Sequence, residues 1–226
     1  MSLRCRGECR TCDGALNAFL DLGKQPLANR LPTADEAAAI ETYPLTLCRC
    51  ERCGLAQLRE VVSPDLLFAD YLYVPSTSTT MREHFDGLAR AAAARLDLAF
   101  DDLVVDVGSN DGLLLSCFQR RGVRILGVEP AANIARAATA AGIPTAEEFF
   151  DVDVAKRLTQ QHGRAALVTA TNVFAHVDDV RGFMRAAFEL LAPDGIFLVE
   201  VQSFADTVDA LAFDMTNHEH VTYWAT

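Results

Sequence analysis

From residue 103 to residue 202 the chain alternates short apolar runs with segments of helical composition. The runs LVVDVG, VRILGVE, ALVTATNVF and GIFLVEVQ are almost continuously apolar, as is typical of strands buried on both faces. The segments 111–122, 131–142 and 180–195 lie between them, and each ends in a glycine that marks a helix stop. This alternation predicts a mainly parallel sheet with helices on both faces, a doubly wound, Rossmann-like α/β fold.

The N-terminal part of the chain lacks this alternation. Residues 1 to about 62 carry glycines and prolines between short apolar pieces, which predicts a loop-rich region. The stretch MREHFDGLARAAAARL predicts a helix introduced by the capping-type residues Ser78, Thr79 and Thr80, and SFADTVDALAF predicts an amphipathic helix. The change in composition predicts two domains, residues 1–75 and residues 76–226.

Composition restricts the partners and the compartment. With 31 acidic and 20 basic residues, the 226-residue chain has a formal net charge of −11 and would repel a polyphosphate backbone, so we expect no nucleic-acid partner. The N-terminus MSLRCRGECR has no apolar signal-peptide core, and no run approaches the roughly 18 apolar residues of a membrane helix. We therefore expect no membrane span and a cytoplasmic location, where cysteines remain thiols or bind metal.

Four cysteines form two C-x-x-C pairs. Cys9 and Cys12 form the first pair, Cys50 and Cys53 form the second, and a glycine follows each pair closely. Two intervening residues let both thiolates of a pair contact one tetrahedral ion at about 2.3 Å, so the pattern predicts a structural zinc site. The 37 residues between the pairs exceed the common ribbon spacing. Cysteines packed in a small core and a redox C-x-x-C pair are the alternatives, although no thioredoxin-like βαβ pattern surrounds either pair.

The turn VVDVGSNDG leaves the first predicted strand and carries Asp106, Gly108, Asn110 and Gly112. Such a turn presents backbone N–H groups and a helix start to a ligand. Asn110 stands where a dinucleotide fingerprint has its second glycine, and the aspartates of the loop would oppose a pyrophosphate. Glu129 ends the next strand, where a carboxylate can accept both ribose hydroxyls of an adenosine. Together these residues favour S-adenosylmethionine as the cofactor. The alternative cofactor, a nicotinamide dinucleotide, would indicate an oxidoreductase.

Further polar residues follow the later strands. Asn172 and His176 come after the ALVTAT run, at the sheet edge that faces ligands in such folds. Near the end of the chain His218, Glu219 and His220 form a triplet. From the residues alone the triplet is either a metal site, which needs an extended segment with both imidazoles on one face, or a solvated strand end. The remaining histidines are expected on helix surfaces: His84 and His162.

Several stretches together match one family. These are the two cysteine pairs and LDLGKQPLANRL, DYLYVPSTSTTM, VDVGSNDG, GVEPAANIA, ATNVFAHVDD, IFLVEVQSF and DMTNHEH. Over essentially its whole length the chain resembles the S-adenosylmethionine-dependent C-methyltransferases that methylate C-3 of dTDP-linked 4-keto deoxysugars in antibiotic biosynthesis. The resemblance implies a small zinc-binding and substrate-lid domain over residues 1–75 and an S-adenosylmethionine domain over residues 76–226. It also implies a further C-terminal domain, which we expect to be absent here.

The resemblance also implies a mechanism. Methylation of a carbon beside a ketone needs a base for the α-proton and a methyl electrophile in line with the resulting enolate. In the family the base lies in the segment that matches HEH, which assigns it to His220, with Glu219 alongside and His176 from the FAHVDD segment. A histidine suits this role because its unperturbed pKa lies near neutrality. The residues implied to contact the sugar nucleotide are Tyr71, Tyr73, Ser76, Thr77, Ser78 and Asn217.

Two features differ from the family pattern. Asn217 stands where the family has a tyrosine, and an amide can hydrogen bond but cannot deliver a phenolic proton. The family sheet continues with two more strands after the triplet, whereas this sequence ends at Thr226, so we expect IFLVEVQ to form an exposed apolar edge that favours poor solubility or self-association. A cofactor- or partner-binding homologue with impaired turnover is therefore the alternative to an active methyltransferase.

Overall fold

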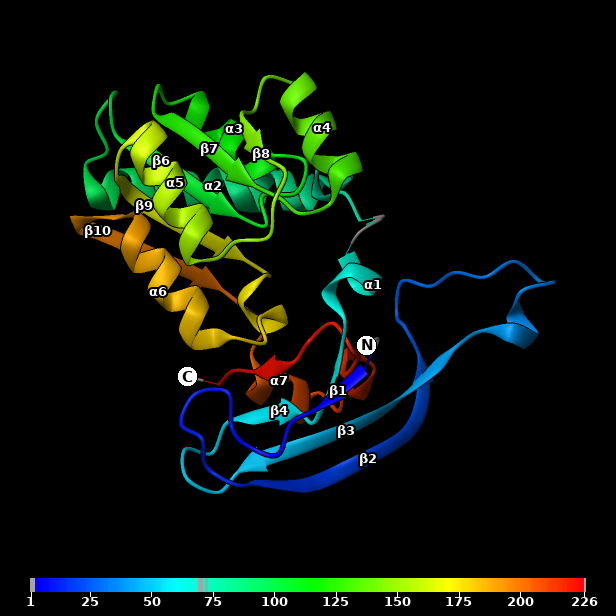
Figure 1. The fold of residues 1–226 in the computed structure, drawn as a ribbon. Helices are drawn as coiled ribbons and strands as arrows, with labels where there is room; N and C mark the ends of the chain where they lie inside the picture. Colours follow the sequence, from blue (N-terminus) through cyan, green and yellow to red (C-terminus); the bar gives the residue numbers. More distant parts are fainter. Residues whose placement is uncertain (1–2, 69–70, 72, 226) are drawn as a thin grey trace. The chain divides into compact units, whose positions relative to one another are not determined.

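A computed structural model describes residues 3–68, 71 and 73–225 of the chain (Figure 1). The chain divides into two compact units, each built from separate stretches of sequence. The first unit, here called the cysteine unit, consists of Met1–Phe68, Phe174–Arg181 and Val201–Thr226. The second, here called the sheet unit, consists of Ala69–Val173 and Gly182–Glu200. The segment that carries His176 and the segment that carries the histidine triplet therefore both belong to the cysteine unit.

The sheet unit contains a five-stranded sheet in the order β10-β9-β6-β7-β8, with every neighbouring pair parallel. Its strands are β6 (Leu103–Val107), β7 (Arg124–Val128), β8 (Thr145–Ala146), β9 (Ala165–Thr171) and β10 (Leu191–Glu200). Strand β6 lies at the centre, since Val104 pairs with Ile125 on one side and with Leu167 on the other. The predicted parallel α/β fold is confirmed.

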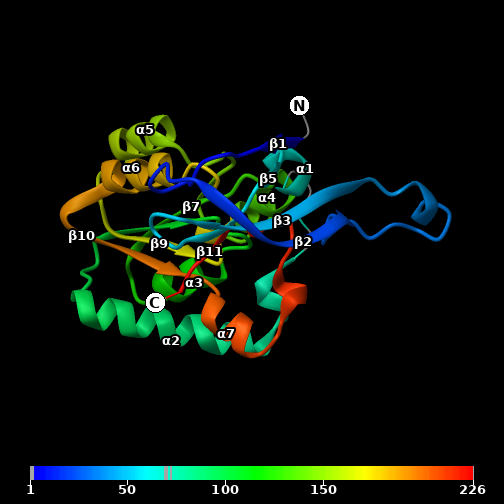
Figure 2. The same cartoon turned by 90° about the horizontal axis from the view of Figure 1, so that it is seen from below.

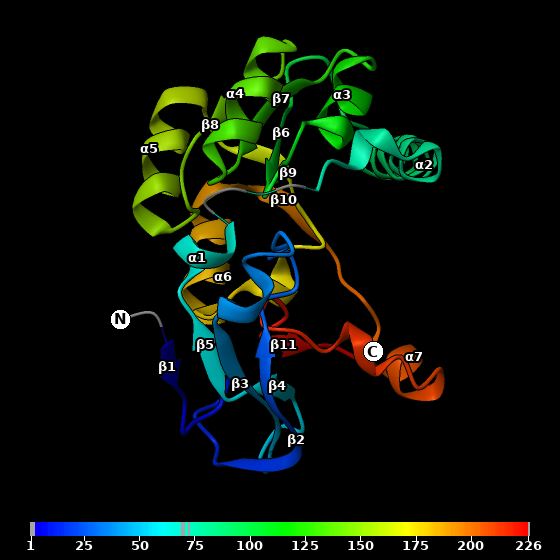
Figure 3. The same cartoon turned by 90° about the vertical axis from the view of Figure 1, so that its right-hand side faces the viewer.

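Helices cover both faces of this sheet (Figure 3). They are α2 (Thr79–Leu96), α3 (Leu113–Gln119), α4 (Ala132–Ala140), α5 (Val152–His162) and α6 (Val180–Leu190). On one face Phe85 of α2 and Phe118 of α3 pack in the same apolar cluster as Val104 of the sheet. On the other face Phe183 of α6 lies against Phe197 of β10, with ring centroids 6.1 Å apart. Ser78 caps α2 as predicted, because its hydroxyl accepts the N–H of Met81 at 3.4 Å.

The predicted helix over residues 180–195 is shorter than expected. Helix α6 ends at Leu190, and β10 begins at the next residue. The register of β10 on β9 shifts between Leu191 and Ile196, so the Pro-Asp-Gly sequence forms an irregularity at the start of the strand. Strand β10 lies at one edge of the sheet in the described part of the chain, as expected. Helix α5 and the short strand β8 were not predicted from the sequence.

The prediction that residues 1–62 are loop-rich is wrong. This region forms most of a four-stranded sheet, in the order β11-β4-β3-β2, and a two-stranded sheet of β1 and β5. The strands are β1 (Leu3–Cys5), β2 (Leu16–Pro26), β3 (Thr42–Cys50), β4 (Ala56–Leu58), β5 (Glu60–Val62) and β11 (Thr222–Tyr223). Figure 2 shows β2 and β3 as a long hairpin. Strand β2 escaped prediction because almost all of it is exposed, so it lacks the apolar–polar alternation of a half-buried strand.

Two further helices belong to the cysteine unit, α1 (Pro64–Phe68) and α7 (Phe204–Asp209). The helix predicted over 203–213 stops early because Leu211 takes a left-handed conformation with φ of 53°. Four single-turn 3-10 helices complete the described structure: η1 (Ala37–Ala39), η2 (Pro75–Thr77), η3 (Phe174–His176) and η4 (Phe213–Met215). None of the helices in the described residues is both long enough and apolar enough to cross a membrane.

Candidate functional site

The β2–β3 hairpin brings the two cysteine pairs together. Cys9 and Cys12 precede β2, and Cys50 is the last residue of β3. The hairpin register pairs Leu16 with Cys50, so the two ends of the hairpin meet where the cysteines lie. The 37 residues between the pairs consist largely of this hairpin, which explains why the spacing is longer than in common zinc ribbons.

The four sulfur atoms have the spacing of a tetrahedral metal site. All lie within 4.8 Å of one another, with 3.6 Å between the Sγ atoms of Cys9 and Cys53 and 3.5 Å between those of Cys12 and Cys50. Zinc–sulfur bonds of about 2.3 Å place the corners of a tetrahedron about 3.8 Å apart. Among the histidine, cysteine and acidic side chains of the described residues, these four cysteines form the group whose ligand atoms lie close enough to hold one metal ion. Its donor set fits a structural zinc ion.

Neighbouring groups orient the sulfurs. Arg52 and Cys53 direct their backbone N–H groups at Cys50 Sγ, at 3.4 and 3.5 Å, and Gln57 donates its side-chain amide to Cys9 Sγ at 3.2 Å. Burial alone would raise the pKa of the Cys9 thiol, but hydrogen bonds from Thr11 and Gln57 outweigh it and lower that pKa to about 6. A Cβ at Gly14 would lie 2.9 Å from Cys50 Sγ, so this position has no room for a side chain. The other cysteines lie outside the cluster.

In the sheet unit the glycine loop follows β6, and both of its glycines lie in the left-handed region that favours this residue. Gly108 has φ of 67° and Gly112 has φ of 77°. A Cβ at Gly108 would lie 2.3 Å from Val173 Cγ2, and a Cβ at Gly112 would lie 2.7 Å from Ile143 Cγ2. Both positions therefore require glycine for conformation and for space.

Two buried carboxyl groups lie beneath this loop. Glu129 accepts the N–H of Asn110 at 3.0 Å and the N–H of Ala131 at 2.8 Å, one on each oxygen. Burial raises the pKa of Glu129, and these two hydrogen bonds oppose the change. Asp106 accepts the hydroxyl of Thr169 at 2.6 Å, and burial raises its pKa to about 7. Each Glu129 oxygen still has a lone pair for a ligand hydroxyl.

The polar stretch before α2 is tied to the glycine loop within the same unit. Asn110 donates its side-chain amide to the carbonyl of Tyr73 at 2.9 Å, and Ser76 donates its N–H to Asp111 at 3.2 Å. The Tyr71 carbonyl accepts the side-chain amide of Asn133 at 3.2 Å. Of the other predicted substrate residues here, Thr77 donates to the Val74 carbonyl and Ser78 caps α2. The structure thus brings this stretch to the predicted cofactor loop.

Asn172 lies at the same carboxyl edge of the sheet. It has a left-handed φ of 57°, and its N–H donates to the carbonyl of Glu200 at 2.8 Å. The side chain of Glu200 accepts the ring N–H of His84 at 2.7 Å. His84, for which the sequence predicted a helix surface and no role, is therefore half of a pair that links α2 to the end of β10. The oxygens and carboxylates of this edge suit a ligand that carries hydroxyl, amino and cationic groups.

In the cysteine unit, His220 and His176 lie together. Their ring centroids are 5.0 Å apart, with the rings edge to face. His220 donates Nδ1–H to the carbonyl of Met215 at 3.2 Å, so its Nε2 is the basic nitrogen of the neutral ring. Burial lowers the pKa of His220. The neutral, proton-accepting form is therefore present at pH 7, as a general base requires.

The two histidines of the triplet have different surroundings. His218 is fully buried, and its Nε2–H points at the carbonyls of Tyr43 and Pro44, at 3.2 and 3.1 Å. It therefore ties the triplet to β3, whereas His220 faces His176. The metal-site interpretation of the triplet is wrong, because the metal-type clusters among the described residues include neither imidazole. The strand-end interpretation is wrong too, since His218 and Glu219 are buried.

Glu219 and Asn217 complete this segment. Glu219 accepts the side-chain amide of Asn29 at 2.6 Å, and burial raises its pKa. Asn217 folds back on its own turn: its side-chain oxygen accepts the N–H of Glu219 at 3.0 Å, and its amide donates to Met215 at 3.4 Å. Sequence reasoning missed Tyr223, whose buried ring lies 6.4 Å from that of His220. No local signal distinguishes it from an ordinary core aromatic.

Family models match both parts of the chain. One, described as "Putative zinc binding domain", matches residues 9–68, and one described as "Methyltransferase domain" matches residues 79–225. The first contains all four clustered cysteines, and the second contains the glycine loop and both histidine segments.

Individual relatives agree with these matches. The C-methyltransferase NovU from Streptomyces niveus is 38% identical over 96% of this chain and 52% of its own length. A ubiquinone biosynthesis O-methyltransferase from Azorhizobium caulinodans is 32% identical over 54% of this chain and 47% of its own length. The chain thus spans about half the length of these curated relatives. Among solved structures, the chain is similar to one chain of a Haloferax volcanii complex between the Trm112 methyltransferase activator and a methyltransferase, with a TM-score of 0.50. The match covers 66% of this chain and 67% of that chain at 19% identity, so it shows the fold alone.

Proposed function

The chain belongs to the methyltransferase family whose model matches residues 79–225, and we propose that it methylates C-3 of a dTDP-linked 4-keto deoxysugar. The predicted cofactors, S-adenosylmethionine and a structural zinc ion, are confirmed by the matching domains and the cysteine cluster. Carbon as the acceptor atom is supported by the similarity to NovU along 96% of the chain. Because the chain spans about half of that relative, the activity and the substrate of the whole protein are both part of the proposal.

The observation that carries this proposal is the state of His220. A methyl acceptor that is a carbon beside a ketone must first lose its α-proton, so the protein needs a base of its own. His220 is partly buried, is neutral at pH 7 because burial lowers its pKa, and donates Nδ1–H to the Met215 carbonyl, which leaves Nε2 to accept a proton. Oxygen methylation of an already acidic hydroxyl would need no such base.

The proposed reaction follows from these groups. His220 Nε2 takes the proton from C-3 of the sugar, and the electron pair of the broken C–H bond forms the enolate with the 4-keto oxygen. His176, whose ring lies against that of His220, holds the base in place. Burial raises the pKa of Glu219, and in its protonated form this carboxyl group would donate a hydrogen bond to the enolate oxygen. When bound, S-adenosylmethionine would supply the electrophilic methyl group for C-3, and breaking of its S–CH3 bond would leave S-adenosylhomocysteine.

The sheet unit is proposed to hold the methyl donor. Glu129 would accept the ribose hydroxyls, while Gly108 and Gly112 let the loop approach the ligand. Asp106 and its buried charge favour a cationic ligand over a pyrophosphate. The remaining assignments in this unit, to the cofactor and to the sugar nucleotide, stay proposals: Asn110, Asn172, Tyr71, Tyr73, Ser76, Thr77 and Ser78.

Several further predictions belong to the same proposal. They are the division of the chain at residue 75, a small-molecule partner in the form of the dTDP-sugar, a cytoplasmic location and a role in antibiotic biosynthesis. Self-association through the apolar edge strand β10 and the absence of a nucleic-acid partner also stay predictions.

A second function, ligand binding with impaired turnover, is favoured by Asn217. The family has a tyrosine at this position, whereas the asparagine side chain is hydrogen bonded within its own turn. A protein of this kind would retain the zinc site and the cofactor loop but would not remove the C-3 proton.

Hydrogen–deuterium exchange at C-3 separates the two functions. The protein is incubated in D2O with a dTDP-4-keto-6-deoxysugar, and deuterium at C-3 is followed by NMR. We expect His220→Asn to slow the exchange by about 10²- to 10⁴-fold, the contribution of a positioned base. His162→Asn is the matched control, since His162 ends α5 in the sheet unit. Exchange that is equally fast in both variants would contradict the proposed base, and no exchange in the unmodified chain would support the second function.

A further inference from the structure

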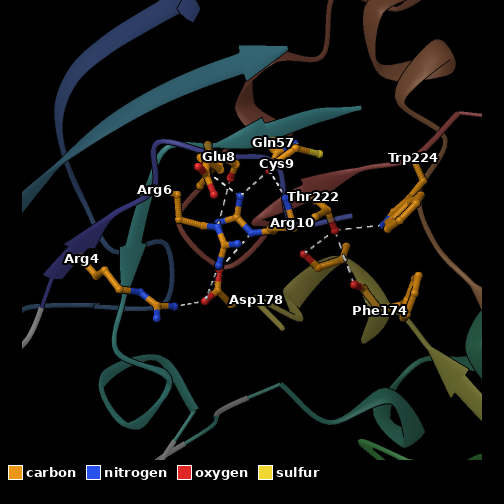
Figure 4. Close-up of polar contacts among 12 residues, drawn as sticks. Arg4, Arg6, Glu8, Cys9, Arg10, Gln57, Phe174, Asp178, Thr222 and Trp224 are labelled. Atoms are coloured by element: carbon orange, nitrogen blue, oxygen red, sulfur yellow. Dashed lines mark hydrogen bonds and ion pairs between the residues drawn. The ribbon is translucent and has the colours of Figure 1, made fainter. Parts of the chain in front are cut away.

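A continuous hydrogen-bond path leaves the cysteine cluster on the side of Cys9 (Figure 4). Gln57 donates its side-chain amide to Cys9 Sγ at 3.2 Å. Its carbonyl oxygen accepts both the backbone N–H and the Nη1–H of Arg10, each at 3.1 Å. Since Arg10 lies between the first two cysteines, Gln57 fixes both the sulfur of Cys9 and the residue that follows it.

Arg10 continues the path away from the cluster. Its guanidinium is fully buried, donates Nη1–H to the carbonyl of Leu58 at 2.7 Å, and donates Nε–H to Asp178 Oδ1 at 3.0 Å. Asp178 also pairs with Arg4 and Arg6, whose side chains are more exposed than that of Arg10. A buried guanidinium needs a carboxylate partner, so Arg10 and Asp178 hold each other strongly in place.

Asp178 lies two residues after His176, and this short segment is fixed from both sides. Beyond Asp178, Arg181 donates to the carbonyl of Thr11, inside the first C-x-x-C pair, at 2.6 and 2.9 Å. Before it, the Ala175 carbonyl accepts the N–H of Val221 at 2.9 Å and Phe174 stacks on Trp224 at 5.1 Å. The segment that carries His176 is thus held between the first cysteine pair and the strand that follows His220.

We propose that Asp178, held by Arg10, is a positioning residue that couples the zinc centre to the imidazole of His176. The metal fixes Cys9, Gln57 and Arg10 fix Asp178, and Asp178 fixes the turn that presents His176 to His220. Such coupling is reciprocal, so a change at Asp178 weakens zinc binding as well as shifting the histidine. The role of His176 in this inference rests on the proposed function, whereas the coupling itself does not.

The test compares Asp178→Asn with Asp35→Asn in the zinc-loaded full chain. The two variants make the same chemical change within the cysteine unit, but Asp35 is an exposed residue between β2 and β3 whereas Asp178 pairs with the buried Arg10. Zinc affinity is measured by competition with a chromophoric chelator. The ring signals of His176 and His220 are followed by NMR, after assignment with single His→Asn variants.

We expect Asp178→Asn to lower zinc affinity about 10-fold, the lower end of the 10- to 100-fold range for groups that orient metal ligands. It should also move the His176 signals, whereas Asp35→Asn should change neither, and Asp178→Glu should restore part of both. Signals and affinity that match those of Asp35→Asn would overturn the coupling.

If Asp178→Asn does not fold, Gln57→Leu tests the other end of the path. It keeps the pair of Arg10 with Asp178 and removes the hydrogen bonds of Gln57 to Cys9 and to Arg10, so it should weaken zinc binding and still shift His176. Unchanged His176 signals in this variant would overturn the proposal. Neither readout depends on turnover, so the two proposals can fail separately. If the Asp178 variant shifts the His176 signals but His220 proves dispensable for C-3 exchange, the proposed function is contradicted and the coupling stands.

Discussion

Replacing Asp106 with asparagine should remove a large pH dependence from the stability of the sheet unit. Asp106 is buried, and burial raises its pKa to about 7, from 3.8 in an unfolded chain, against an opposing hydrogen bond from Thr169. A carboxyl whose pKa is higher in the folded state gives stability that is complete below the unfolded pKa and is lost as pH rises through the folded pKa. The folded and unfolded pKa values differ by about 3, and each pKa unit is about 1.4 kcal/mol, so the stability at stake is about 4 kcal/mol.

Urea unfolding followed by far-UV circular dichroism measures this effect. The signal reports mainly the sheet unit, which contains α2 to α5 and most of α6, while the single tryptophan, Trp224, belongs to the cysteine unit. Between about pH 4 and pH 8, we expect the free energy of unfolding of the unmodified chain to fall by about 4 kcal/mol relative to Asp106→Asn. Asp101→Asn, at an exposed position, should follow the unmodified chain throughout.

Parallel pH profiles for Asp106→Asn and the unmodified chain would refute this reasoning. They would mean that the folded protein holds Asp106 ionised at little cost, through interactions other than the hydrogen bond from Thr169. A buried carboxyl that destabilises the fold at neutral pH is expected only where a ligand benefits from its charge. The profile should therefore flatten when a cationic ligand such as S-adenosylmethionine is added.

Three further predictions concern the loop, the zinc site and the triplet. Gly108→Ala should lower the free energy of unfolding by about 1–3 kcal/mol more than Gly142→Ala, because both glycines have positive φ but, of the two, only Gly108 lacks space for a Cβ. Urea unfolding measures the difference, and equal losses would show that Val173 moves aside. Cys12→Ser should reduce the zinc content from one ion per chain towards none, measured by elemental analysis, and full retention would remove Cys12 from the ligand set. Asn217→Tyr, which restores the family residue, should speed C-3 proton exchange, and a slower rate would show that the hydrogen bonds of Asn217 matter more than a phenol.

The parallel sheet and the zinc ligands could be predicted because their signals are local. Buried parallel strands are continuous apolar runs, and a C-x-x-C pair places two sulfurs on one ion whatever the surrounding fold. Strand β2 of the cysteine unit gave no such signal, since it is exposed along nearly its whole length. The spacing of the cysteine pairs likewise did not reveal the β2–β3 hairpin, which accounts for their long separation.

The candidate site was predictable in its members but not in its arrangement. Sequence spacing cannot show that His218 turns toward Pro44 while His220 turns toward His176, because backbone conformation decides this residue by residue. Nor could it show that Asp178 meets Arg10, since the two are joined only through tertiary structure. Both results depend on the segment after β9 packing within the cysteine unit and not with the sheet that precedes it.

Transfer of a labelled methyl group tests the central claim most directly. The purified chain is incubated with S-adenosylmethionine that carries a 13C methyl group and with a dTDP-4-keto-6-deoxysugar, and the product is examined by carbon–proton correlation NMR. The account predicts a 13C methyl group bonded to C-3 of the sugar, with transfer lost in His220→Asn and retained in His162→Asn. A labelled methyl group on oxygen, or transfer that persists in His220→Asn, would contradict it.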